Sequence, residues 1–224
     1  GIIDPHVHFA LYCGTITSVD DFISGSRSAA YGGVTTIIDF LDPTRNARKL
    51  ERSFYDRLEL AKGCHVDYHF HACIKEPDAD LEQYVLMMKH LGMNTIKLFT
   101  TYSETHRRTY DKDIIKLLEL TKKYNFLVTA HIENDNLVSL KPEYSCTYIS
   151  EARPSECEIS EALKLAKFAK ETNGYLYMVH CSSGETLNRL VNQYGDILGK
   201  HFFVESCPQY FSFNKEVLNS EQGY

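Results

Sequence analysis

Short β-rich runs alternate with helical patterns along the chain, and this rhythm constrains the fold more than any other feature. The runs with strand character are residues 1–9, 35–40, 67–74, 95–99, 126–133, 175–181 and 201–206, and helical patterns lie near 20–31, 46–62, 79–91, 110–124, 156–172 and 184–194. Such alternation implies parallel strands joined by right-handed crossovers. Seven strands in this rhythm predict an α/β fold, namely a TIM (β/α)8 barrel that is incomplete within residues 1–224. A doubly wound sheet remains the alternative.

Composition narrows the class of protein further. The 224 residues are 43% hydrophobic, enough for one domain with a sizeable core. The formal charge of −6 with scattered Lys and Arg argues against a nucleic-acid partner, and the sequence has no apolar run long enough for a membrane span and no signal peptide. The seven cysteines form no CxxC pair, and core thiols are expected at Cys64, Cys73, Cys181 and Cys207, as in a cytoplasmic protein.

Two histidines end the first strand-like run, which reads GIIDPHVHF. His6 and His8 are two residues apart, so the period of a strand places both imidazoles on one face, at the end of the strand where TIM barrels carry their active sites. Neighbouring neutral imidazoles suit a metal such as Zn²⁺. The motif alone is a weak signal, and structural histidines remain the alternative. Asp4 is expected to fix one imidazole tautomer.

A second pair, His69 and His71, falls in the middle of the third strand-like run. Side chains in the middle of the strands form the packed layers inside a TIM barrel. We therefore expect these histidines to be core residues, or to support a site without binding its ligand.

Three more ionisable residues end later strands. Lys97 lies in NTIKLFTTY, His131 in VTAHIEND and His180 in YLYMVHCSSGET. A buried ammonium is costly, so Lys97 either extends its amine to the strand end or reacts with CO2 to form an anionic carbamate, which could bridge two cations. Each residue alone could be structural, but their shared placement favours one site. Residues 134–156 form the longest irregular stretch, expected to be a loop.

Over essentially its whole length the chain resembles the dihydropyrimidinase/hydantoinase family of the amidohydrolase superfamily. GIIDPHVHF is similar to the first-strand metal motif of that family, IKLFTTY to its lysine strand, and AHIEND and VHCSSGE to its two single-histidine strands. RPSECE and VESCPQYF also resemble family signatures. The four metal-binding segments stand in the order found in the family, which makes the resemblance specific.

The resemblance implies two divalent metal ions, usually zinc. It implies that His6 and His8 bind the more buried ion and that His131 and His180 bind the second. Lys97 would bridge both ions as a CO2-derived carbamate, and a hydroxide shared by the ions would open a small cyclic amide to an N-carbamoyl amino acid. The metal-binding aspartate of the eighth strand and a small β-sandwich domain are expected outside residues 1–224, which makes this chain a partial catalytic domain of a longer protein.

Tyr102 narrows the substrate class. It follows Lys97 by five residues, in the loop that leaves the strand. The resemblance implies that it donates a hydrogen bond to the substrate carbonyl in dihydropyrimidinases and hydantoinases, whereas allantoinases and dihydroorotases are not expected to have it. A packing tyrosine is the structural alternative, because the sequence has 15 tyrosines.

Two other functions stay open. One is allantoinase or a related cyclic-amide hydrolase with the same metal ligands. The other is a non-catalytic, dihydropyrimidinase-like assembly protein, against which the presence of all five ligand-type residues argues. The resemblance also implies a homo-oligomer, a tetramer in this family.

Overall fold

The computed structural model describes residues 1–141, 146–214 and 216–217 of the chain. Contacts divide the chain into two compact units, Gly1–Lys97 and Leu98–Tyr224, called the N-terminal unit and the C-terminal unit below. The boundary falls inside one strand, β4 (Thr95–Phe99). Lys97 is therefore the last residue of the first unit.

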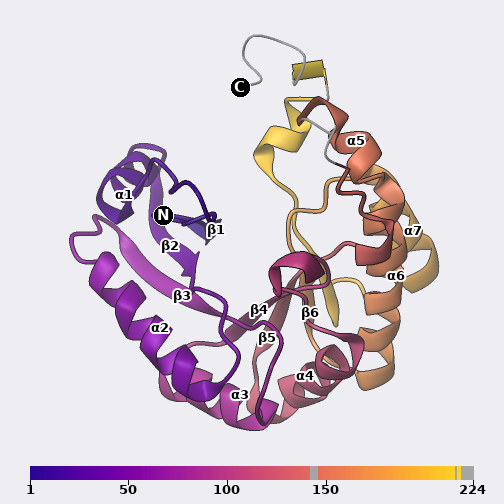
Figure 1. Cartoon of the computed structure of the whole chain (residues 1–224), viewed down its shortest axis with the longest axis horizontal. Coiled ribbons are helices and arrows are strands. Elements are labelled where there is room, and N and C mark those ends of the chain that lie inside the picture. The colour runs from indigo at the N-terminus through magenta and orange to yellow at the C-terminus, as the bar shows by residue number, and fades with distance from the viewer. Residues whose placement is uncertain (142–145, 215, 218–224) are drawn as a thin grey trace. The chain divides into compact units, whose positions relative to one another are not determined.

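The N-terminal unit alternates strands and helices in chain order (Figure 1). Its elements are β1 (Ile2–Val7), α1 (Phe22–Tyr31), β2 (Val34–Phe40), α2 (Ala47–Leu60), β3 (Asp67–Cys73), α3 (Leu81–His90) and the start of β4. Strand β1 pairs with β2, β2 with β3 and β3 with β4, all in parallel. The carboxyl ends of these strands therefore share one edge of the sheet.

The C-terminal unit continues the same alternation. After the end of β4 come α4 (Asp111–Tyr124), β5 (Leu127–His131), α5 (Ile149–Ala152), α6 (Ser155–Thr172), β6 (Leu176–Met178), α7 (Gly184–Tyr194) and β7 (Phe202–Val204). Strand β6 pairs in parallel with β5 and with β7. Among the described residues of this unit, 3₁₀ helices lie in the loops: η1 (Ser103–Thr105), η2 (Asp135–Leu137), η3 (Cys146–Tyr148) and η4 (Pro208–Phe211).

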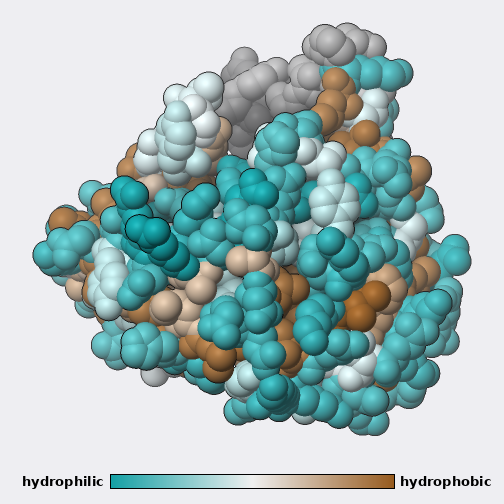
Figure 2. All heavy atoms as spheres, turned by 60° about the horizontal axis from the view of Figure 1, so that its bottom comes forward, coloured by the Kyte–Doolittle hydropathy of each residue, from teal (hydrophilic) through white to brown (hydrophobic). Residues whose placement is uncertain are grey.

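Local sequence explains where the helices begin and which face they bury. Asp21 accepts hydrogen bonds from the amides of Ile23 and Ser24 and caps α1, and the side chain of Asn46 caps α2. In α4 the apolar side chains fall on one face and are buried, including Ile114, Leu117 and Leu118. The face that comes forward in Figure 2 is mostly hydrophilic, with smaller hydrophobic patches.

The predicted strands and helices are all present in the predicted order. The stretch 134–156 differs, because it contains η2, η3 and α5 as well as irregular chain, and part of it lies outside the described residues. Of the expected core thiols, Cys73 and Cys181 are buried, whereas Cys64 and Cys207 are only partly buried. None of the helices found among the described residues is long and apolar enough to cross a bilayer.

Candidate active site

His6 and His8 lie side by side in the N-terminal unit. His6 is in β1 and His8 follows the end of that strand. Their ring centroids are 5.2 Å apart, and both rings contact Phe40 of β2, with centroid distances of 4.8 and 4.7 Å. The expectation that the two imidazoles are neighbours is confirmed.

The surroundings of His8 favour a neutral imidazole. Desolvation by the surrounding chain, followed by the charges of His6 and Lys97, lowers the pKa of His8 to about 3, although the residue is exposed to solvent, which weakens the desolvation. A neutral imidazole has a nitrogen lone pair, which a metal ion requires.

Lys97 is buried in the middle of β4, level with Cys73, the last residue of β3. The residue is only 2% exposed, and its Nζ lies 5.1 Å from the centroid of the Phe40 ring. The amine therefore does not reach solvent at the strand end, which was the structural alternative.

The expectation for the second histidine pair holds for one member only. His71 is buried, and its ring stacks on Phe40 at 4.5 Å. Its Nε2 is 2.8 Å from the carbonyl oxygen of Pro5, and its Nδ1 is 2.5 Å from Thr95 Oγ1. His71 thus supports the chain just before His6.

The core assignment is wrong for His69, which is exposed. The first half of β3 is covered on one face only, so Phe70 is buried while His69, on the other face, is not. Asp4 also differs from its expected role. Its carboxylate accepts a hydrogen bond from the backbone N–H of His6 at 3.1 Å, so it fixes the backbone there, and within the described part of the chain no contact of Asp4 with an imidazole is found.

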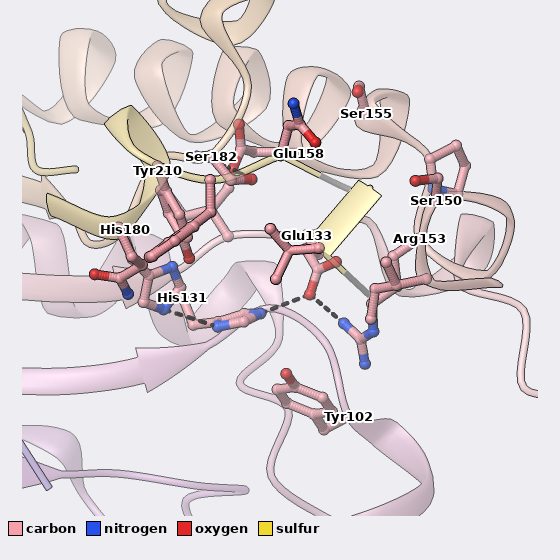
Figure 3. A pocket seen from close by; sticks show the side chains of 17 residues that line it. Tyr102, His131, Glu133, Ser150, Arg153, Ser155, Glu158, His180, Ser182 and Tyr210 are labelled. Atoms are coloured by element: carbon pink, nitrogen blue, oxygen red, sulfur yellow. Dashed lines mark hydrogen bonds and ion pairs between the residues drawn. The ribbon is translucent and has the colours of Figure 1, made fainter. Parts of the chain in front are cut away.

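His131 and His180 meet in the C-terminal unit, as Figure 3 shows. His131 Nδ1 lies 3.1 Å from His180 Nε2. His131 Nε2 lies 2.6 Å from a carboxylate oxygen of Glu133, two residues further along the chain. Because a carboxylate only accepts hydrogen bonds, Nε2 carries the proton and Nδ1 presents its lone pair toward His180.

Arg153 completes this cluster. Its Nη1 donates to the same Glu133 oxygen, and its guanidinium carbon lies 4.9 Å from the centroid of the Tyr102 ring. The Tyr102 ring is in turn 5.1 Å from that of His131. Burial raises the pKa of Tyr102, opposed by the charge of Arg153, so the phenol keeps its proton and can donate it in a hydrogen bond.

These side chains line a cavity of about 820 Å³ whose residues all belong to the C-terminal unit. Tyr102, His131, Glu133, Arg153 and His180 share this cavity, and the Tyr102 hydroxyl points toward His131 and Glu133 in Figure 3. Its volume is within the range of small-molecule sites.

Two glutamates hold the backbone around His180. This residue has a φ of +40°, in the left-handed region that non-glycine residues rarely adopt. Its N–H donates to Glu205 at 3.0 Å. The buried carboxylate of Glu158 accepts from the N–H groups of Ser182 and Ser183 at 2.9 and 3.0 Å. The direction of His180 is therefore fixed from two elements.

The donors fit divalent metal ions. In each unit two imidazoles are adjacent. The Nε2–H of His131 donates a hydrogen bond to the Glu133 carboxylate, an arrangement typical of metal-bound histidine. Within residues 1–141, 146–214 and 216–217, no group of three or more His, Cys, Asp or Glu side chains could hold a metal ion. Each pair of histidines would therefore need a further ligand, either a group of another type or a side chain outside the described residues.

Sequence reasoning missed Glu133, Arg153 and Glu158. The signal for Glu133 was available, because in HIE the two-residue period of a strand places it on the face of His131. Arg153 and Glu158 lie in RPSECE, where nothing in the local pattern indicates a contact with Tyr102 or with the loop after β6.

The chain belongs to the amidohydrolase family, which it matches over residues 1–195. The D-phenylhydantoinase of Escherichia coli O9:H4 (strain HS) is 32% identical over 238 aligned positions, which cover 100% of this chain and 49% of that protein. The chain thus spans about half the length of the curated relatives it matches.

Solved structures agree with this assignment. A D-hydantoinase from Bacillus sp. AR9 has a TM-score of 0.87 at 26% identity, with 99% of this chain and 49% of that chain covered. A D-hydantoinase (dihydropyrimidinase) from Thermus sp. has a TM-score of 0.85 at 26% identity, with 98% and 49% covered. The resemblance to the dihydropyrimidinase/hydantoinase family is confirmed, and so is the fold class, an α/β TIM barrel of which the described residues form seven strands.

Proposed function

We propose that the protein containing this chain hydrolyses a small cyclic amide, opening a dihydropyrimidine or hydantoin ring to an N-carbamoyl amino acid. The observation that carries the proposal is the placement of Tyr102, a half-buried phenol beside His131 in a cavity of about 820 Å³. The similarity to hydantoinases supports cyclic amides as the class of substrate.

Two divalent metal ions, zinc in the first instance, are part of the proposal. His6 and His8 would hold one ion and His131 and His180 the other, and Lys97 would contribute to both as a carbamate. Bound metal would supply Lewis acidity and a water molecule with a lowered pKa. The burial of Lys97 supports the carbamate, because an ammonium beside two dications is strongly disfavoured.

The side chains of this chain have separate tasks in that reaction. Tyr102 donates a hydrogen bond to the substrate carbonyl oxygen, and this bond strengthens as the oxygen gains negative charge. Glu133 keeps the proton of His131 on Nε2, so that Nδ1 remains a ligand. Arg153 neutralises Glu133 and packs against the Tyr102 ring.

Two alternative functions remain. Allantoinase activity would use the same ligands, but Tyr102 favours the hydantoin-type substrate. An assembly protein without activity would need no metal, whereas all five ligand-type residues are present. We further propose a cytoplasmic homotetramer, as the family resemblance implies, which light scattering on the full-length protein can check.

The test is a comparison of the full-length protein with its Tyr102→Phe variant. We expect turnover of dihydrouracil or hydantoin, about two metal ions per chain, and a loss of roughly 10²-fold in kcat for the variant, which lacks one oxyanion donor. Metal content and folding should stay unchanged, because the ring is kept. A metal-replete variant within about two-fold of wild type would contradict the role of Tyr102, and a wild-type protein without metal or turnover would contradict the function.

A further inference from the structure

The loop after β4, which carries Tyr102, is held by a carboxylate from the loop after β5. Asp135, at the start of η2, accepts hydrogen bonds from Thr101 Oγ1 at 3.0 Å, from the N–H of Ser103 at 3.2 Å and from Ser103 Oγ at 2.6 Å. It therefore contacts the residues immediately before and after Tyr102, and all of these residues belong to the C-terminal unit.

Tyr102 needs such a restraint because of its backbone. Its φ of +67° and ψ of +40° lie in the left-handed region, which is unfavourable for a residue with a large side chain. Conformations of this kind persist where the surroundings over-determine them, and they cluster at functional sites. The Tyr102 carbonyl is also engaged, since it accepts from the N–H groups of Thr105 at 3.2 Å and Arg107 at 3.1 Å.

We propose that Asp135 is a positioning residue, which clamps Thr101 and Ser103 and thereby holds the Tyr102 phenol toward the cavity. The inference rests on the proposed function, because Tyr102 is taken to meet the substrate. Among the described residues that line the cavity, Asp135 is not included. Its effect on the reaction must therefore pass through Tyr102.

The charge around Asp135 supports a clamp that stays ionised. Arg108 Nη1 lies 3.1 Å from Asp135 Oδ2, and the two side chains are 18% and 11% exposed. Burial opposes ionisation of Asp135, but the hydrogen bonds from Ser103 and Thr101 and the charge of Arg108 outweigh it and lower its pKa. A carboxylate with hydrogen bonds on both oxygens is a stronger acceptor than a neutral group.

The test uses a double-mutant cycle in the full-length protein, with Asp135→Ala, Tyr102→Phe and the double variant. We expect Asp135→Ala to lose roughly 10²-fold in kcat, as Tyr102→Phe does, and the double variant to lose no more than either. The Asp135→Asn variant keeps one acceptor oxygen and should therefore retain a higher kcat than Asp135→Ala. Asp196→Ala is the matched control, because it removes another carboxylate of this unit that pairs with a basic side chain, Lys170 at 2.8 Å, and lies outside α4.

Hydrogen exchange provides a readout that does not depend on turnover. Amides of residues 101–107 should exchange faster in Asp135→Ala, while those of α4 stay protected, and the control should show no change in either segment. If Asp135→Ala does not fold, Ser103→Ala removes the closest donor and serves in its place.

Unchanged exchange in residues 101–107, or additive losses in the cycle, would overturn the clamp. A wild-type protein that opens no cyclic amide would overturn the proposed function instead, and the exchange measurement would still decide whether Asp135 holds the loop.

Discussion

Lys97 is the residue whose burial is hardest to reconcile with its ordinary charge. The side chain is almost fully buried beside the Phe40 ring. An ammonium in this place would raise the local positive charge and would repel metal ions held by His6 and His8. Carbamylation reverses the sign of the charge and creates oxygen ligands.

Replacing Lys97 with Ala should therefore abolish turnover in the full-length protein, and short carboxylic acids in the buffer should restore part of it by occupying the vacated volume. The measurement is kcat with and without acetate or propionate, together with metal content. Lys62→Ala, at an exposed site in the same unit, is the control. Full activity of Lys97→Ala without any additive would rule out the bridging role.

Glu133 controls which nitrogen of His131 carries the proton. Because its carboxylate accepts from His131 Nε2, it selects the tautomer that presents Nδ1. Glu133→Gln should weaken binding of the second ion by roughly 10–100-fold, the usual cost of losing such a partner. Titration of the metal-free full-length protein with Zn²⁺ against a chelator measures this, and Glu185→Gln, on the exposed side of α7, is the control. An affinity equal to that of wild type would show that His131 is oriented by other contacts.

The strands and helices contain a buried charge pair that makes stability depend on pH. Asp39 of β2 and Arg57 of α2 are 2.7 Å apart, with side-chain exposures of 0% and 5%. Burial raises the pKa of Asp39 to about 6 from its ordinary 3.8, although the charge of Arg57 opposes the shift. The folded state therefore binds this proton more tightly than the unfolded state does.

The sign of the pH dependence follows from that difference. Between about pH 4 and about pH 6 the folded state holds more protons, so the free energy of unfolding should fall as the pH rises, by on the order of 3 kcal/mol for a shift of about two pKa units. Urea unfolding of the full-length protein at several pH values measures it. Asp39→Asn should remove this part of the slope, and a variant with the slope of wild type would assign it to other groups.

The elements were predictable to a large extent because their signals are local. The period of apolar residues and the caps at Asp21 and Asn46 lie within each segment, so the order and the approximate ends of strands and helices follow from the sequence. The exposure of His69 was not predictable, since it depends on which face of β3 the rest of the chain covers.

The molecule as a whole distributes its ligand-type residues over two units. His6, His8 and Lys97 belong to the N-terminal unit, and His131 and His180 belong to the C-terminal unit. Sequence placed all five at strand ends, because the (β/α) rhythm fixes where strands stop. It could not indicate the contacts of Arg153 with Glu133 and Tyr102, because these join loops that are distant in sequence and depend on tertiary packing.

Glu158 has a consequence for the order in which the chain folds. Ser183, the first residue before α7, does not cap that helix with its own side chain; instead Glu158, in α6, accepts from the N–H groups of Ser182 and Ser183 and from Thr186 Oγ1. The segment just before α7 is thus held by a residue some two dozen positions away, and it is completed only after α6 has docked, so α7 should become protected late and together with α6. Pulse-labelled hydrogen exchange should find the two helices protected in one kinetic step, and in Glu158→Ala the amides of Ser182 and Ser183 should exchange freely while α4 keeps its protection.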